Sequence, residues 1–267
     1  EQIGQLFKKY KPDICLHAAA RAGVRASLTK PFLYSQVNYV GSQVLLEAVR
    51  NFSPKTKLVI FSSSSVYGIQ NMAPFSETMT ANPQSPYGIS KYAMELLAKQ
   101  YSEIYGLKIT VIRPFSIYGP RGRLDMAPFL TILAAERGKI FTKFGSSKNN
   151  KRDWTYIDDL INGVVSLIEK IPFKQFEIFN LGNSNPIGID TFISVFQNQI
   201  ENKLNKKLKI KHSQRSKEEL PLTFANINKA KKHFGYDPKI SFNEGVELLF
   251  ADYLIKRKRY KNILNFK

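Results

Sequence analysis

A tyrosine and a lysine four residues apart are the pair in this chain with the clearest chemical use. Tyr87 and Lys91 follow Ser85 and Pro86, which suit the cap and the first position of a helix. Such a helix places the phenol and the ammonium on one face. A nearby ammonium stabilises the phenolate and lowers the phenol's pKa from about 10 towards neutrality. Tyr87 then becomes a usable general base or acid, although this spacing alone occurs often by chance.

Small hydroxyl side chains follow two predicted strands near this helix, which strengthens the interpretation. The apolar run of residues 57–61 leads directly into four serines at 62–65, and Ser116 follows the strand at residues 109–112. The first apolar run, residues 14–17, is followed by three alanines. Open α/β sheets bind ligands at the carboxyl ends of their strands. We therefore expect these three strand ends to line one crevice.

Strands and helices alternate in the first part of the chain, as in a parallel sheet with crossover helices. After Gly119 the elements become shorter, and prolines and polar turns become denser. The predicted strands are residues 14–17, 57–61, 109–112 and 177–181. The predicted helices are residues 3–10, 31–49, 86–105, 126–137, 157–169, 188–201, 228–234 and 242–256.

The composition is that of a folded protein with a basic surface. The 267 residues are 43% hydrophobic and 12% aromatic, with a formal charge of +19. No apolar run nears the ~20 residues of a membrane span, and a single cysteine, Cys15, favours a cytoplasmic location. The charge could attract nucleic acid or a membrane surface, but the lysines are spread out and lack interleaved aromatic residues. A solvated basic surface is the favoured interpretation, with a polyanion-binding patch as the alternative.

Five motifs in order resemble the NAD-dependent epimerase/dehydratase family of extended short-chain dehydrogenases. They are H-x-A-A at 17–20, N-x-x-G-x-x-x-L-L-E at 38–47, S-S-S-S-V-Y-G at 62–68, S-P-Y-G-x-S-K at 85–91 and R-P-F-x-x-Y-G-P at 113–120. Residues 151–159 and 179–183 resemble the substrate half of the same family. The resemblance implies an α/β fold, a Rossmann-type doubly wound parallel sheet whose N-terminal strands are missing, with a smaller α+β substrate-binding domain.

The resemblance also implies the domain organisation. Residues 1–118 would form a partial NAD-binding domain, to which residues 154–182 return, and residues 119–153 and 183–267 would mainly bind the nucleotide sugar. No G-x-x-G-x-x-G precedes the first strand, where the family has its dinucleotide fingerprint. We therefore expect an N-terminally truncated chain that alone binds NAD weakly, is inactive or unstable, and exposes an apolar edge at Ile14.

In the chemistry that the resemblance implies, Tyr87 is the catalytic base, Lys91 tunes it and holds the nicotinamide ribose, and Ser63 hydrogen-bonds the reacting sugar oxygen. Tyr87 would take the proton of the 4-hydroxyl while hydride passes from C4 to NAD. The 4-keto sugar would then turn over and take the hydride back on its other face. The residues implied in NAD binding are Ala18, Ala19, Ala20, Asn38, Ser62, Tyr87, Lys91 and Pro114.

Within the family, the chain most closely resembles the UDP-glucuronate 4-epimerases. Dehydratases and decarboxylases carry acidic residues just before V-Y-G, where this chain has Ser64 and Ser65. These two hydroxyls, with Ser116 and Arg123, would surround the sugar's carboxylate. We therefore expect an enzyme that interconverts UDP-glucuronate and UDP-galacturonate, with a UDP-glucose/UDP-galactose 4-epimerase as the alternative.

Several further assignments follow from the resemblance. Arg152 would meet the diphosphate, with an ion pair to a nearby aspartate as its alternative, and Arg215 is a candidate for a second phosphate contact. Arg113 is as readily structural as ligand-binding, and His17 is expected to support its strand end.

The expected partners are a UDP-sugar and a second copy of the chain, joined through residues 31–49 and 86–105. No metal, membrane or nucleic-acid partner is expected. From a different class, an inactive truncated relative that binds nucleic acid or another polyanion would also explain the charge and the missing fingerprint.

Overall fold

The computed structural model describes residues 1–148, 150–214, 221–258 and 260. These residues form two compact units. Unit 1 comprises Glu1–Phe115, Val165–Leu181 and Ala225–Tyr236, and unit 2 comprises Ser116–Val164, Gly182–Phe224 and Asp237–Lys267. The segment predicted to return to the NAD-binding domain at residue 154 returns to unit 1 at Val165. Ala225–Tyr236, which was predicted to lie in the sugar-binding domain, also belongs to unit 1.

Unit 1 is built on a four-stranded parallel sheet in the order β1-β2-β3-β7. The strands are β1 Ile14–His17, β2 Lys57–Phe61, β3 Ile109–Pro114 and β7 Phe176–Leu181. All four predicted strands are confirmed, and the parallel order confirms the α/β fold class. Because every strand runs the same way, the carboxyl ends of all four meet at one edge of the sheet.

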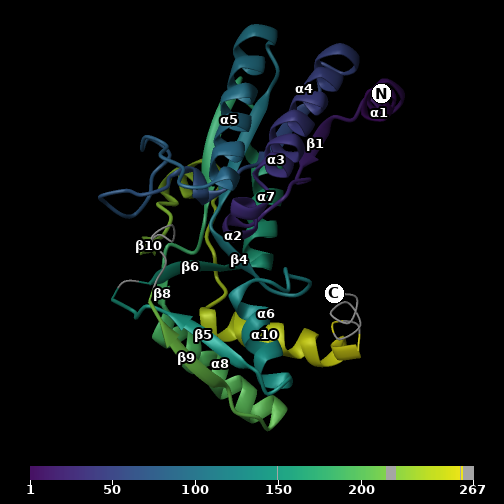
Figure 1. Ribbon diagram of the computed structural model, residues 1–267. Helices are drawn as coiled ribbons and strands as arrows, with labels where there is room; N and C mark the ends of the chain where they lie inside the picture. Colours follow the sequence, from purple (N-terminus) through teal and green to yellow (C-terminus); the bar gives the residue numbers. More distant parts are fainter. Residues whose placement is uncertain (149, 215–220, 259, 261–267) are drawn as a thin grey trace. The chain divides into compact units, whose positions relative to one another are not determined.

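The helices of unit 1 include the long pair α4 and α5, which lie side by side (Figure 1). The helices are α1 Gln2–Tyr10, α2 Val24–Thr29, α3 Pro31–Tyr34, α4 Gly41–Phe52, α5 Pro86–Tyr105 and α9 Asn228–Phe234, and α7 Ile157–Lys170 runs from unit 2 into unit 1. The predicted helix at 31–49 is interrupted by a π-helical segment, Ser35–Val40, between α3 and α4. The apolar spacing of this π-helical segment is close to that of an α-helix, so the sequence does not distinguish the two.

The core of unit 1 lies between these helices and the sheet. Leu46 and Val49 of α4 and Met94 of α5 pack with Leu58 and Ile60 of β2, and all five are at most 1% exposed. Each buried aliphatic side chain of this size contributes roughly 1.5–3 kcal/mol. This packing fixes α5 against the sheet, and with it the residues for which chemistry is predicted.

The outer strand β1 carries an exposed apolar side chain. Among the described strands β1 pairs with β2 alone, and Leu16 is 47% exposed. This agrees with the apolar edge expected from the sequence.

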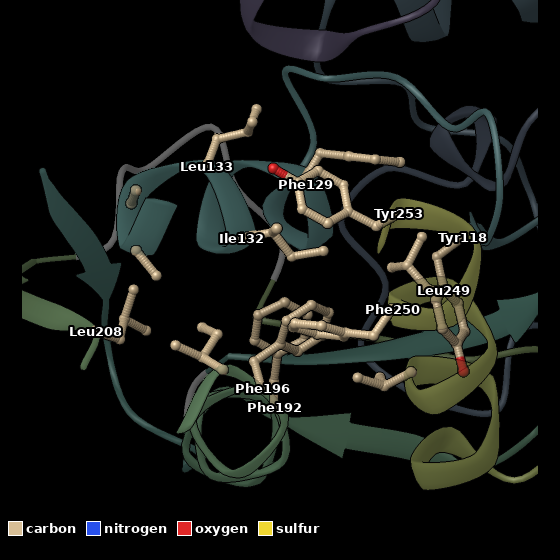
Figure 2. Packing of buried hydrophobic residues seen from close by; sticks show 14 of the residues in the cluster. Tyr118, Phe129, Ile132, Leu133, Phe192, Phe196, Leu208, Leu249, Phe250 and Tyr253 are labelled. Carbon is tan, nitrogen blue, oxygen red and sulfur yellow. The ribbon is translucent and has the colours of Figure 1, made fainter. Parts of the chain in front are cut away.

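Unit 2 combines short strands with helices around an aromatic core (Figure 2). Its strands are β4 Ser116–Tyr118, β5 Ile140–Phe144, β6 Lys151–Tyr156, β8 Pro186–Gly188, β9 Lys209–Ser213 and β10 Leu222–Thr223, and its helices are α6 Ala127–Glu136, α8 Ile189–Leu204 and α10 Phe242–Ile255. Strand β6 lies between β4 and β10 and also pairs with β8, while β5 pairs with β9. Phe192 and Phe196 of α8 stack with ring centroids 4.5 Å apart, and Phe250 of α10 packs against Phe196.

Candidate active site

The predicted Tyr87–Lys91 pair lies on the buried face of the first turns of α5. Gly88 N donates to Ser85 Oγ at 3.1 Å and Pro86 occupies the first helical turn, which confirms the predicted helix start. Tyr87 is 9% exposed and Lys91 is 4% exposed. The ring of Tyr34, from α3, meets the ring of Tyr87 edge-on at 6.1 Å. Backbone capping therefore fixes the start of α5, and aromatic packing restrains the ring of Tyr87.

Lys91 connects α5 to the carboxyl end of β2. Its Nζ donates to the carbonyl oxygen of Phe61 at 2.6 Å. Burial lowers the pKa of Lys91 from 10.5 to about 8, and the charge of Glu95 partly opposes this shift. Lys91 therefore stays mainly protonated at pH 7. An ammonium can donate three hydrogen bonds, and one backbone carbonyl uses one of them. Such a donor fits the ribose hydroxyls of a nicotinamide cofactor.

The buried ammonium of Lys91 predicts a pH-dependent stability. Between pH 8 and 10.5 the unfolded chain binds more protons at this lysine than the folded chain, so stability rises with pH in that window. The rise amounts to about 3 kcal/mol. Lys91→Met is expected to remove it and to stabilise the chain at pH 7. Urea unfolding of both proteins from pH 7 to 11 measures the difference, and parallel curves would contradict the predicted effect of burial.

The four serines after β2 occupy distinct environments. Ser62 and Ser63 are buried, whereas Ser64 and Ser65 are partly exposed in a short 3₁₀ turn, Ser64–Val66. The Ser63 hydroxyl caps this turn, accepting from Ser65 N at 3.1 Å and lying 3.2 Å from Ser65 Oγ. The Ser62 hydroxyl donates to the carboxylate of Glu95. A hydrogen-bonded turn thus holds Ser63, the predicted contact to the sugar oxygen, at the end of β2.

Gly88 allows α5 to approach this turn closely. A Cβ at Gly88 would lie 2.7 Å from the carbonyl oxygen of Ser65 and 3.0 Å from Cβ of Pro83. Gly88→Ala is therefore expected to destabilise the chain by about 1–3 kcal/mol. The matched control is Gly41→Ala, also in a helix, where the nearest atom would lie 3.9 Å away and about 0.5–1 kcal/mol of stabilisation is expected. Thermal unfolding of both variants tests the prediction. Equal changes in stability for Gly88→Ala and Gly41→Ala would contradict it.

Asn38 holds the loop that follows β1. Its Nδ2 donates to Arg21 O and to Ser90 Oγ, both at 2.9 Å, and its Oδ1 accepts from Arg21 N at 2.7 Å. Asn38 is 1% exposed, and these bonds engage both of its amide hydrogens. The structure thus shows a loop-fixing role, while a direct contact to NAD stays a prediction.

The other predicted cofactor contacts also lie at strand ends. The small side chains Ala18, Ala19 and Ala20 follow β1, with the first two exposed, and the partly exposed Pro114 ends β3. His17 lies 2.8 Å from Ser42 Oγ, which supports its expected role of holding the strand end. Burial, together with the charge of Lys91, lowers the pKa of His17 to about 4. His17 is therefore uncharged at neutral pH.

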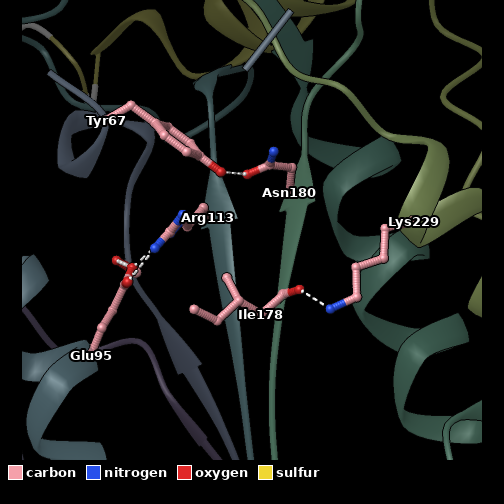
Figure 3. Close-up of polar contacts among 7 residues, drawn as sticks. Tyr67, Glu95, Arg113, Ile178, Asn180 and Lys229 are labelled. Atoms are coloured by element: carbon pink, nitrogen blue, oxygen red, sulfur yellow. Dashed lines mark hydrogen bonds and ion pairs between the residues drawn. The ribbon is translucent and has the colours of Figure 1, made fainter. Parts of the chain in front are cut away.

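Arg113 is a structural residue in a buried polar network (Figure 3). Its Nε and Nη2 donate to the two carboxylate oxygens of Glu95 at 3.0 and 2.6 Å, and its guanidinium lies 4.7 Å from the ring centre of Tyr67. The Tyr67 hydroxyl donates to Asn180 Oδ1 at 2.7 Å. Burial raises the pKa of Tyr67 to about 12, so this phenol stays protonated. Of the two roles considered for Arg113, its contacts support the structural one. Glu95, its partner, was not predicted from the sequence.

The predicted substrate contacts in unit 2 lie on separate elements. Ser116 begins β4 and is partly exposed. Arg123 forms a two-pronged ion pair with Asp125, at 3.0 and 2.7 Å. Arg152 lies in β6 and donates from Nη1 to Lys151 O at 2.9 Å. Arg215 lies outside the described residues.

Two negative observations concern the described residues alone. Among them, no helix has both the length and the apolar character to cross a membrane. In the same part of the chain, no group of three or more His, Cys, Asp or Glu side chains is placed to hold a metal ion.

Comparisons with known proteins point to one family. Residues 1–249 match the family described as GDP-mannose 4,6 dehydratase. The chain is 39% identical over 249 residues to the UDP-glucuronate 4-epimerase of Thermodesulfobacterium geofontis, covering 92% of this chain and 74% of that protein. It is 35% identical over 268 residues to UDP-glucuronate 4-epimerase 4 of Arabidopsis thaliana, covering 95% of this chain and 61% of the plant protein.

A solved structure shows the same fold. The crystal structure of UDP-glucuronic acid 4-epimerase from Bacillus cereus, in complex with UDP-glucuronic acid and NAD, is 32% identical and superposes with a TM-score of 0.86. The match covers 96% of this chain and 79% of the Bacillus chain.

Proposed function

This chain belongs to the family of NAD-dependent epimerases and dehydratases, and from that membership we propose that it is a UDP-glucuronate 4-epimerase using NAD. The observation that carries the proposal is the buried Tyr87–Lys91 face of α5 against the serine turn at the end of β2. The Thermodesulfobacterium relative of that name and the Bacillus structure with UDP-glucuronic acid and NAD support the choice of substrate and cofactor.

We assign the proton transfer to Tyr87. A general base must reach the proton that it removes, and the packing of Tyr87 against Tyr34 fixes where its hydroxyl lies. The Ser63 hydroxyl would hydrogen-bond the same sugar oxygen, and its place at the head of the serine turn restricts its movement. When bound, NAD would supply a reversible acceptor for the hydride at C4 of the sugar.

Lys91 has two tasks in this proposal. Its protonated ammonium would donate to the ribose hydroxyls of the cofactor, and its charge would favour the phenolate of Tyr87. The lowered pKa of about 8 places the loss of that charge just above neutral pH. We therefore expect activity to decline on the alkaline side as Lys91 loses its proton.

Neutral hydroxyls select the acidic sugar in this proposal. Ser64 and Ser65, next to Ser63, would bind the glucuronate carboxylate by charge-assisted hydrogen bonds, and Ser116 and Arg123 are carried over from the family resemblance as further candidate carboxylate contacts. Arg123 would then exchange its ion pair with Asp125 for the substrate carboxylate. Arg152, with its planar guanidinium, is the proposed diphosphate contact.

The assay compares two substrates. The protein expressed from its full gene is incubated with UDP-glucuronate or with UDP-glucose, and the products are separated by anion-exchange chromatography. The proposal expects UDP-galacturonate from the first substrate and little UDP-galactose from the second. The reverse preference would favour the UDP-glucose 4-epimerase, and no conversion of either would reject both.

We further propose that the enzyme is a cytoplasmic homodimer. Helices α4 and α5 lie side by side, and Val44, Ile89 and Leu96 on them are between 44% and 55% exposed. Exposed apolar side chains on two adjoining helices are a candidate protein interface. Light scattering should give twice the mass of one chain. The Leu96→Asp variant should have the mass of a single chain.

A further inference from the structure

Two side chains of α5 hold two consecutive residues at the end of β2. Lys91 donates to the backbone carbonyl of Phe61 at 2.6 Å, and Glu95, one helical turn later, accepts the hydroxyl hydrogen of Ser62. The next residue is Ser63, which caps the serine turn. The position of Ser63 therefore depends on contacts that come from α5 and not only on the strand.

Glu95 is itself held firmly. It is 2% exposed, and its two oxygens accept from Nε and Nη2 of Arg113 at 3.0 and 2.6 Å (Figure 3). A two-pronged guanidinium pair of this kind fixes the plane of the carboxylate. Arg113 lies in β3, so one carboxylate connects the end of β2, the neighbouring strand β3 and helix α5.

We propose that Glu95 is a positioning residue of the active site: its carboxylate fixes Ser62 and thereby sets where Ser63 lies relative to Tyr87 and Lys91. The proposal rests on the proposed function, since it assigns Glu95 a task in the same site. Glu95 acts through Ser62 and Lys91 and is not assigned a contact with substrate.

Glu95 also supplies the negative charge that favours the protonated form of Lys91. Tyr87 and Glu95 lie four residues before and after Lys91 on α5, the charge of Lys91 acts on His17 of β1, and Arg113 of β3 pairs with Glu95. The pKa of His17 is lowered to about 4, so His17 is uncharged at neutral pH, and Arg113 is neutralised by its pair with Glu95. Burial lowers the pKa of Lys91, and Glu95 raises it.

The first test removes the contact between Ser62 and Glu95 but keeps the ion pair. In Ser62→Ala, amide hydrogen exchange at residues 63–67 should accelerate, and turnover of UDP-glucuronate should fall about tenfold or more with little change in KM. The matched control is Ser102→Ala. This substitution removes a fully buried serine hydroxyl on α5, the helix that carries Glu95, where it donates to Leu107 O at 2.7 Å. The control should leave both the exchange at 63–67 and the turnover unchanged.

The second test removes the charge. In Glu95→Gln, the midpoint of the Lys91 titration should move to lower pH, as measured by competitive acetylation with trace acetic anhydride and peptide mass spectrometry. Ser62→Ala keeps the charge of Glu95 and should leave that midpoint unchanged.

Hydrogen exchange needs no turnover, so it decides the positioning role even if the chain proves not to be an epimerase. Unchanged exchange at 63–67 in Ser62→Ala would overturn the positioning role, and an unmoved Lys91 midpoint in a folded Glu95→Gln would exclude the effect of the Glu95 charge on Lys91. Equal losses of turnover in Ser62→Ala and Ser102→Ala would also contradict it, because they would indicate a general effect on folding.

Discussion

Replacing Tyr87 with phenylalanine is expected to lower turnover of UDP-glucuronate by about 10²- to 10⁴-fold, the range that general acid–base catalysis supplies. The substitution removes one oxygen atom and keeps the ring, so the edge-on contact with Tyr34 survives. The fold should therefore remain intact while proton transfer fails. Steady-state kinetics measures the first effect, and thermal unfolding measures the second.

Tyr34→Phe is the matched control for that experiment. Tyr34 is 3% exposed, touches the same ring, and donates from its hydroxyl to Ala22 O at 2.9 Å. Losing this bond should cost about 1 kcal/mol of stability and leave most of the turnover. A Tyr87→Phe enzyme with near-normal turnover, or two variants with equal losses, would exclude Tyr87 as the base.

Glu95→Ala is expected to cause the largest loss of stability, about 3–5 kcal/mol. The substitution leaves the buried guanidinium of Arg113 without its counter-charge, and Nη1 of Arg113 already has no hydrogen-bond partner within the described residues. Replacing both partners, as Glu95→Leu with Arg113→Met, should recover most of the loss because no unpaired charge remains. Urea unfolding of the three proteins measures the difference.

The control is an exposed ion pair within α5, the helix that carries Glu95. Lys99 and Glu103 are 3.6 Å apart with about half of each side chain exposed. Glu103→Ala should change stability by less than about 1 kcal/mol, as is usual for surface pairs. If Glu95→Ala cost no more than this control, the buried network would not stabilise the fold as we expect.

The long elements could be predicted because their patterns are strong. Helix α5 carries its own cap and proline, and β2 is a continuous apolar run, so both are observed close to their predicted bounds. The shortest strands of unit 2 could not be predicted in the same way. Strand β10 has two residues and β8 has three, and so few residues show no periodicity.

The site was predictable to the extent that its residues are close in sequence. Tyr87 and Lys91 lie on one helix, and their shared face follows from the spacing. The role of Glu95 could not be predicted, since it depends on Arg113 and Ser62 from two different strand ends. Its position four residues after Lys91 on a buried face is the only local signal. The substrate, the cofactor and the reaction came from the family resemblance, not from the spacing.

In the proposed reaction, C4 of the sugar is oxidised and then reduced by the same hydride. To test this, UDP-glucuronate carrying deuterium at C4 is incubated in ordinary water with the protein expressed from its full gene. The product is analysed by NMR and mass spectrometry. UDP-galacturonate that retains deuterium at C4 is the expected product. Product with solvent hydrogen at C4, or no product at all, would contradict it.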